Sequence, residues 1–294
     1  MNKEKVEVVP YNTEWAKMFE LEAILIKEAL GQNCLQTYHI GSTAVPGLSA
    51  KPVIDIIAVV KDIMKVDEAN KAMENLGYKS KGENGMLFRR FFQKRGRGNN
   101  YNIHIFEEGN SEIDRHFKFR DWMINHADDR ALYEKLKKDL AAKYPNDIFN
   151  YCFGKERFVA DIDKKTGFNG LRVVKALTPR ELKAVEHFRE KSSTGKMLKD
   201  AAEVANHSSK ILEATEAFDR SENIYFALYQ GSDIIGYANI QLIPDTVKLA
   251  ITWDIFIDEP YRSQDIDNQL SAIFKRWIEE QGIVQSLKFS FNSL

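Results

Sequence analysis

The sequence has few of the features that mark secreted, membrane-spanning or metal-cluster proteins. Its two cysteines, Cys34 and Cys152, lie far apart, which argues against a disulfide framework and against a cysteine-rich zinc site. No apolar run approaches the roughly 20 residues that a membrane helix needs. The first residues, Met1 to Lys5, are polar and do not lead into an apolar signal core. We therefore expect a cytoplasmic protein with no membrane partner.

A strong excess of charge of either sign is also absent. The chain has 42 Lys and Arg against 43 Asp and Glu, so its net charge is -1. Because neither half has the strongly positive field of a general nucleic-acid binder, we expect no such binding. Basic residues gather only between Arg89 and Arg97, in a predicted hairpin. The tip of this hairpin is predicted to be solvated, whereas Arg89 or Arg90, within the strand itself, could reach a bound phosphate.

The chain has ample apolar residues for two cores. Hydrophobic residues make up 44% of its 294 residues, and this length suits two domains better than one. We predict an α+β protein with a first domain over 1–162, a polar linker over 163–170 and a second domain over 171–294. The strands predicted for the first domain are 6–9, 35–40, 53–60, 86–93 and 100–106. Its predicted helices are 13–30, 66–76, 111–126, 128–143 and 147–160.

The most informative segment runs from His39 to Ile56 and reads HIGSTAVPGLSAKPVIDI. A predicted strand leads into Gly41, where the absence of a side chain lets a ligand approach the backbone closely. The amides that follow, and the hydroxyls of Ser42 and Thr43, can donate hydrogen bonds to a phosphate. The segment therefore predicts a phosphate-binding loop.

A cation and an acid follow this loop. Lys51 adds a positive charge, and Asp55 then interrupts an otherwise apolar strand. A carboxylate in such a strand is costly unless it is paired or bound to a metal. Taken singly, the loop is explained by a turn and Asp55 by a satisfied buried acid. Together they are typical of a nucleotide site in which a strand carboxylate holds Mg²⁺, so Asp55 is our candidate metal ligand.

This segment resembles the GrpB family of the nucleotidyltransferase superfamily, whose members carry a Gly-Ser-Thr-Ala/Ser-Val-Pro-Gly-Leu-x-x-Lys-Pro-x-Ile-Asp-Ile run. The resemblance continues over nearly all of residues 5–162. Its further matching positions are His104 within Asn102–Ile105, Phe119-Arg120-Asp121, Tyr133, Leu136-Lys137, Tyr151 and Lys155. The resemblance implies a mixed sheet flanked by helices and a link to nucleotide chemistry. Relatives fused to dephospho-coenzyme A kinase hint at coenzyme A metabolism.

One position departs from the pattern of active nucleotidyltransferases. These enzymes usually carry a second carboxylate two residues after the first, and here that position is Ile57. On the neighbouring strand, where a third acid is expected, the sequence has Asn102 and His104. His104 joins Asp55 as a candidate catalytic residue, and Lys155, on the last helix of the domain, could reach the same pocket.

The second domain resembles a shortened, degenerate GNAT acetyltransferase. Its predicted elements are a strand at 171–176, helices at 179–191 and 197–217, strands at 225–229, 234–242 and 248–257, a helix at 269–281 and a strand at 286–291. In that family an Arg/Gln-x-x-Gly-x-Gly/Ala loop binds the pyrophosphate of acetyl-CoA. Arg262 fits the first position, but Asp265 and Asp267 occupy both glycine positions. Because these acids repel phosphate and cap a helix well, we expect helix caps rather than an acetyl-CoA site. The unpaired edge of the last strand favours a homodimer.

Three functions remain open on this sequence. The leading hypothesis is a protein that binds a nucleotide or phosphorylated small molecule, with nucleotidyltransferase activity that uses Mg²⁺. Gly41, Ser42, Thr43, Lys51, Arg89 and Lys155 would bind phosphate. The second hypothesis is an N-acetyltransferase that uses acetyl-CoA through Arg262. In the third, both domains are former enzymes that now serve binding or assembly.

Overall fold

The computed structural model describes residues 5–96, 100–192, 223–244 and 249–280. The chain divides into two compact units. The first comprises residues 1–84 and 88–170, and the second comprises 85–87 and 171–294. The predicted helix at 197–217 and the predicted strand at 286–291 lie outside the described residues. Within the described part, no helix is both long enough and apolar enough to cross a membrane.

The first unit is built on a five-stranded mixed sheet in the order β1-β2-β5-β4-β3. Its strands are β1 (Cys34–Ile40), β2 (Ile54–Val60), β3 (Lys79–Ser80), β4 (Arg89–Lys94) and β5 (Tyr101–Glu107). The central strands β2 and β5 run parallel, while β1 and β4 each run antiparallel to their inner neighbours. Paired residues share a face, so Asp55, Asn102 and His104 lie on the same side of the sheet.

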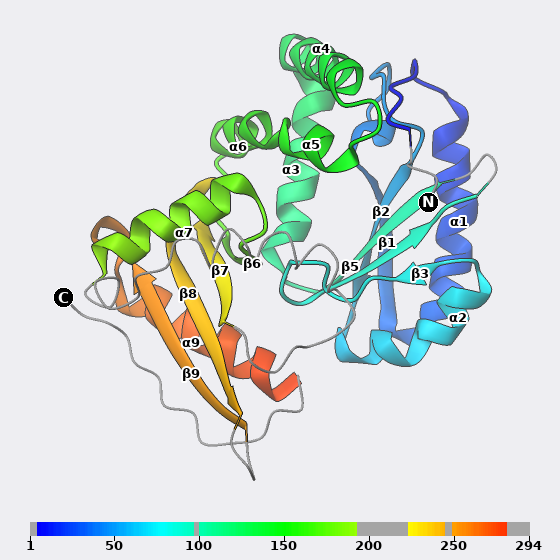
Figure 1. Cartoon of the computed structure of the whole chain (residues 1–294). Helices are drawn as coiled ribbons and strands as arrows, with labels where there is room; N and C mark the ends of the chain where they lie inside the picture. Colours follow the sequence, from blue (N-terminus) through cyan, green and yellow to red (C-terminus); the bar gives the residue numbers. More distant parts are fainter. Residues whose placement is uncertain (1–4, 97–99, 193–222, 245–248, 281–294) are drawn as a thin grey trace. The chain divides into compact units, whose positions relative to one another are not determined.

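Helices cover both faces of this sheet (Figure 1). They are α1 (Glu14–Leu30), α2 (Asn70–Asn75), α3 (Ser111–Asn125), α4 (Ala127–Lys143), α5 (Ile148–Phe153) and α6 (Glu156–Lys165), with single-turn or short 3₁₀ helices η1 (Gly31–Asn33), η2 (Ser42–Ala44) and η3 (Met64–Ala69). On one face, apolar residues of β2 and β5 pack with Trp15, Ile26 and Leu30 of α1. A second core joins the segment after β1 to α3, α4 and α6 through Val45, Leu48, Met123, Tyr133 and Ile162.

Several predicted boundaries shifted. The predicted first strand is reduced to one bridge between Val9 and Ala50. Helix α1 begins where expected, but Asn12 rather than Thr13 accepts the hydrogen bond from its first turn, with Glu14 N 3.0 Å from Asn12 Oδ1. The predicted helix at 66–76 begins as η3 and becomes α-helical only at Asn70.

The predicted linker is packed into the first unit at two positions. Helix α6 continues to Lys165, whereas the sequence predicted that it would end near residue 160. Asp163 and Phe168 are both buried, since only 2% and 5% of their surfaces are exposed. An acid and an aromatic ring thus hold this segment in place.

The second unit contains a four-stranded antiparallel sheet in the order β6-β7-β8-β9. Its elements are β6 (Leu171–Lys175), α7 (Pro179–Lys191), β7 (Asn223–Gln230), β8 (Asp233–Pro244), β9 (Leu249–Ile257), the short η5 (Glu259–Tyr261) and α9 (Gln264–Glu280). Thr178 caps α7 in the predicted capping box with Glu181. Over the described residues, the order of elements agrees with the sequence prediction.

The sequence predicted one strand over 86–93, but residues 85–87 lie outside β4 and belong to the second unit. Met86 bridges to Val174 of β6, and the amide of Lys175 donates to the Gly85 carbonyl at 2.8 Å. The flanking residues Asn84 and Phe88 have φ values of 46° and 59°, which non-glycine residues rarely adopt. The chain thus turns sharply on both sides of this short segment, and β4 begins only at Arg89.

Candidate functional site

The candidate site lies where β1 ends and where β2 and β5 begin. Asp55, the second residue of β2, is in register with Asn102 of β5. The Asn102 side chain donates from Nδ2 to Asp55 Oδ1 at 2.8 Å, and His104 Nε2 lies 3.9 Å from the same oxygen. The Asp55 side chain keeps 29% of its surface exposed, so a ligand can reach it. The structure therefore brings the two predicted catalytic residues together.

The charge states of this pair follow from their surroundings. Burial raises the pKa of Asp55, but the nearby His104 ring, the hydrogen bond from Asn102 and the positive charge of Lys155 outweigh it, so the pKa of this carboxyl lies below its usual range. Burial lowers the pKa of His104, and Asp55 offsets this only in part. The site thus pairs an ionised carboxylate with a neutral imidazole near pH 7. Among the described residues, His104 Nδ1 has no hydrogen-bond partner.

Gly41 holds the start of the loop in a conformation that only glycine adopts readily. Its φ and ψ are 69° and -169°, a region that other residues essentially avoid. A Cβ atom at this position would lie 2.7 Å from Asp55 Oδ2, which is too close for any side chain. Glycine is therefore required both by the backbone and by the acid beside it, as the sequence pattern predicted for a close approach.

Three predicted residues from distant parts of the chain meet around Tyr133 of α4. Burial raises the pKa of the Tyr133 hydroxyl, while the nearby Lys155 and Ser42 lower it and Asp55 adds to the increase, so all three residues lie near this side chain. Lys155 lies at the junction of α5 and α6, with its Nζ 4.5 Å from the centre of the Tyr151 ring. It is half-buried, and its tyrosine, cysteine and Asp55 neighbours raise its pKa above the ordinary value despite burial, so it is a cation at neutral pH.

Tyr133 is fixed in place by its own packing. Its ring stacks on Phe158 at 4.9 Å and meets Phe119 edge-on at 5.4 Å. Lys137 Nζ lies 4.8 Å from the centre of the same ring. The sequence prediction gave neither Tyr133 nor Lys137 a role in the site. Their spacing of four residues on a predicted helix, which places both on one face, is the signal that could have linked them.

The other predicted phosphate-binding residues lie less favourably for contact with a phosphate. The Thr43 hydroxyl is buried and lies 3.0 Å from His39 Nε2, so it makes a contact inside the protein and is not exposed to a ligand. Lys51 is half-buried after the loop, and its carbonyl accepts from the Val53 amide at 2.7 Å. Arg89 shares the face of Asp55, but its guanidinium donates to the Glu83 and Asn84 carbonyls at 3.1 and 2.7 Å.

The donor set around Asp55 does not fit a Mg²⁺ site built by the protein alone. Mg²⁺ prefers several oxygen ligands in an octahedral arrangement. Here Asp55 Oδ1 already accepts from Asn102, and Ile57, at the position of the expected second acid, is fully buried. Across the described ranges, no three His, Cys, Asp or Glu side chains are placed to hold a metal ion. The structure therefore supports ligand binding at this site better than it supports a two-metal reaction.

Comparison with known proteins matches residues 5–165 to the family described as GrpB protein. The chain belongs to the GrpB family. It is 40% identical over 157 residues to UPF0157 protein YqkA of Bacillus subtilis, a match that covers 53% of this chain and 46% of that protein. It is also similar to a dephospho-CoA kinase of Mycolicibacterium paratuberculosis, with 26% identity over 181 residues, 53% of this chain and 44% of the kinase.

A solved structure shares the fold of the first unit. The crystal structure of conserved protein GrpB from Enterococcus faecalis is 38% identical and has a TM-score of 0.52. The match covers 54% of this chain and 96% of that one. The resemblance to GrpB is thus confirmed for the first unit, whereas the resemblance of the second unit to acetyltransferases stays a prediction.

Next to Asp55 and His104, α3 contributes a chain of polar side chains that the sequence did not indicate. His116 keeps only 23% of its side chain exposed, and its ring lies 5.6 Å from that of His104. Its Nδ1 lies 2.7 Å from the Glu112 carbonyl oxygen. Arg115 then links the buried carboxylates of Glu112 and Asp163, with N···O distances of 3.4 and 2.9 Å. These contacts connect the site to α6.

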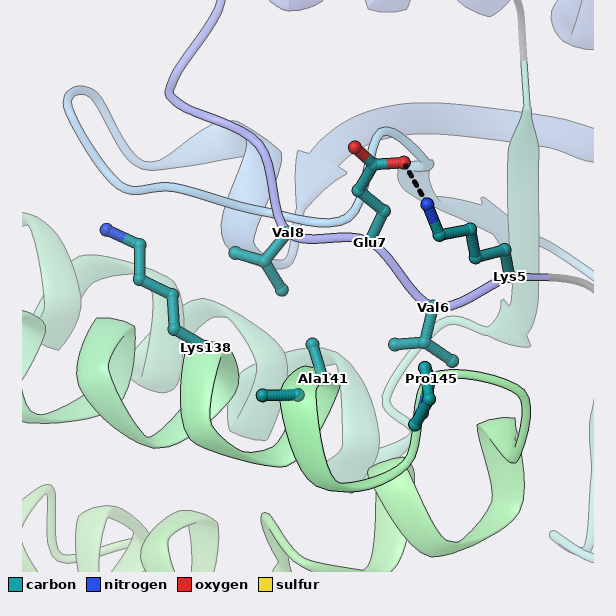
Figure 2. Close-up of a pocket in the computed structure, with 8 residues that line it drawn as sticks. Lys5, Val6, Glu7, Val8, Lys138, Ala141 and Pro145 are labelled. Atoms are coloured by element: carbon teal, nitrogen blue, oxygen red, sulfur yellow. Dashed lines mark ion pairs between the residues drawn. The ribbon is translucent and has the colours of Figure 1, made fainter.

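A surface hollow of about 360 Å³ lies elsewhere in the first unit, between residues 5–8 and α4 (Figure 2). Small apolar side chains such as Val6 and Ala141 line it. Its charged residues Lys5 and Glu7 pair with each other at 3.7 Å. No residue of the Asp55 group lines this hollow, and nothing in its chemistry indicates a specific ligand.

In the second unit, Arg262 is engaged by the protein itself. Its Nε donates to the Ile257 carbonyl at 2.8 Å, and its guanidinium carbon lies 5.5 Å from the centre of the Phe256 ring. Asp265 and Asp267 both lie in the first turn of α9, where acids stabilise a helix start. The expected helix cap by these acids is wrong, because the helix begins at Gln264 and the Ser263 hydroxyl accepts from the Ile266 amide at 3.2 Å. The arrangement gives no support to an acetyl-CoA site.

Proposed function

We propose that the first unit binds a nucleotide or another phosphorylated small molecule beside the loop that begins at Gly41. The observation that carries this proposal is the contact between the start of the loop and Asp55, where a Cβ atom at Gly41 would lie 2.7 Å from Asp55 Oδ2. Ser42, Asp55 and Lys155, which are up to 113 positions apart, all influence the pKa of Tyr133, which indicates that they lie near one another. The apolar residues beside this group are buried, whereas these three polar side chains remain partly exposed. Such a partly exposed polar cluster within an apolar frame is typical of a ligand site.

Each side chain has a separate task in this proposal. Lys155 supplies a fixed positive charge for a phosphate, and Ser42 supplies a hydroxyl on the neighbouring loop. The ionised Asp55 would repel a phosphate placed directly against it. Asp55 and Asn102 are better suited to a hydroxyl or amine of the same ligand, because a carboxylate accepts from such groups. The proposed ligand therefore carries both a phosphate and a neutral polar group, as nucleotides do.

The comparison with a dephospho-CoA kinase suggests which phosphorylated molecules to test first. We propose dephospho-CoA, CoA, ADP and ATP as probes, with inorganic pyrophosphate as the minimal anion. Binding to the full-length protein would be measured by isothermal titration calorimetry. Lys155→Met removes this cation and is expected to raise the dissociation constant at least about tenfold, because a charge-assisted hydrogen bond of about 1.5–3 kcal/mol is lost.

A matched control uses Lys135 of α4. Its side chain is highly exposed and pairs with Asp139 at 2.8 Å, away from the Tyr133 ring. Lys135→Met is expected to bind every probe as the wild type does. The proposal is wrong if no probe binds at millimolar concentration, or if Lys155→Met binds as tightly as the wild type.

A further inference from the structure

One helix contacts both ends of the loop that begins at Gly41. Ser42, at the start of the loop, is a close neighbour of the Tyr133 side chain and lowers its pKa. Near its end, Lys137 Nζ donates to the Ser49 carbonyl, and the Ser49 hydroxyl donates to Glu134 at 2.8 Å. Because these three side chains come from two adjacent turns of α4, that helix sets the distance between the two ends of the loop.

Lys137 is the least expected member of this group. Only 1% of its surface is exposed, although lysine is rarely buried without an acid beside it. Its ammonium group lies over the Tyr133 ring at 4.8 Å and donates to a carbonyl rather than to a carboxylate. The charged groups that face it are Lys155, Glu134 and Lys138. Two of these three are positive.

The proton on Lys137 is therefore weakly held. Burial and the positive charge of Lys155 lower the pKa of Lys137 to about 7, with Glu134 opposing and Lys138 adding to the effect. Because opening the loop to water would restore the ordinary pKa of 10.5, the closed loop holds Lys137 most favourably in its neutral form. The loop is thus expected to be held more firmly above pH 7 than below it.

We propose that Lys137 is a positioning residue of the phosphate site, which fixes the Ser49 end of the loop and thereby holds Ser42 near Tyr133. The part of this inference that concerns a ligand rests on the proposed function. A phosphate next to Lys155 would cancel the repulsion between the two ammonium groups and favour the protonated form of Lys137. The contact to Ser49 exists without any ligand and can be tested alone.

Amide hydrogen exchange of the full-length protein tests the contact. The amides of Ala44, Val45, Leu48 and Ala50 make backbone hydrogen bonds in or beside the loop and report on its opening. After correction for intrinsic exchange rates, their protection in the wild type is expected to rise about tenfold between pH 6 and pH 8, because opening the loop to water restores the ordinary pKa of Lys137. Lys137→Arg, which stays charged, and Lys137→Met, which has no charge, should both lack this rise. Lys135→Met should behave as the wild type.

The outcomes separate this inference from the proposed function. The same pH dependence in the wild type and in Lys137→Arg overturns the positioning role, even if Lys137→Met fails to fold. Added pyrophosphate, which favours the protonated form of Lys137, should reduce the rise in protection of the wild type between pH 6 and pH 8. If it does not, while the pH effect and the behaviour of Lys137→Arg are as expected, the positioning role stands and the phosphate proposal fails.

Discussion

Replacing Gly41 by alanine tests whether the loop and Asp55 are fitted to each other. The φ of 69° and ψ of -169° at this position cost about 1–3 kcal/mol for a residue that has a Cβ. The new Cβ would also lie 2.7 Å from Asp55 Oδ2 and 3.1 Å from Asp55 Cβ, so one of the two chains must move. Overlap of this kind adds about 1–3 kcal/mol. Gly41→Ala is therefore expected to lower the free energy of unfolding by about 2–6 kcal/mol.

Gly47 provides a control within the same loop. Its φ is 77°, but a Cβ there would meet nothing within 4 Å. Gly47→Ala thus carries backbone strain without overlap, at about 1–2 kcal/mol. Urea denaturation of both variants and of the wild type, at one pH and followed by circular dichroism, gives the difference.

A double variant identifies the source of that difference. Asp55→Ala removes the carboxylate that the new methyl group would strike, so Gly41→Ala should cost less in its presence. The coupling free energy is expected to exceed about 1 kcal/mol. If Gly41→Ala costs no more than Gly47→Ala and shows no coupling to Asp55→Ala, then the close approach of loop and acid does not shape this site.

Two buried charges give further predictions. Because the pKa of Lys137, about 7, lies below its ordinary 10.5, the unfolded chain binds more protons between these values and stability rises with pH there. Between pH 7 and 9 the wild type should gain about 2 kcal/mol relative to Lys137→Met in chemical denaturation, and parallel pH profiles of the two proteins would contradict this. Arg115→Met should destabilise by about 3–5 kcal/mol, because it removes the cation that pairs with the buried carboxylates of Glu112 and Asp163. Lys118→Met, which removes an exposed ion pair of the same helix, should cost less than about 1 kcal/mol, and an equal loss in both variants would refute the reasoning.

Local sequence signals located most elements of the fold. The near-continuous apolar run predicted β2, and Gly31 ended α1 with a φ of 56°, as its place in the sequence indicated. Thr178 and Glu181 form the capping box that their spacing predicted. These features depend on residues a few positions apart, so a single sequence contains the information that they require.

Contacts between distant residues could not be predicted in this way. Lys94 was expected to be solvated at a hairpin tip, yet its Nζ pairs with the buried Glu22 at 2.8 Å and lies 5.3 Å from the ring centres of both Tyr78 and Tyr101. Helical periodicity shows that Glu22 is on α1, but not which strand residue lies opposite it. The buried acid and its partner are 72 positions apart.

The candidate site likewise combines residues that a local motif indicates with residues that only the folded structure brings together. Gly41, Ser42 and Asp55 belong to one continuous motif, so the sequence could indicate them together. Lys155 was added by the family resemblance, and the structure places it near Asp55. Lys137 was missed because most lysines on amphipathic helices are solvated, and only the packing of α4 against the loop shows that this one is buried.

The short segment 85–87 has a practical consequence for anyone who divides this chain. These residues belong to the second unit, where Met86 bridges β6, although 84 residues of the first unit precede them. A fragment that starts at Leu171 would expose the Val174 edge that Met86 otherwise covers, and exposed strand edges promote aggregation. Attempts to assay the second unit by itself should therefore keep the whole polypeptide and inactivate the GrpB site by substitution.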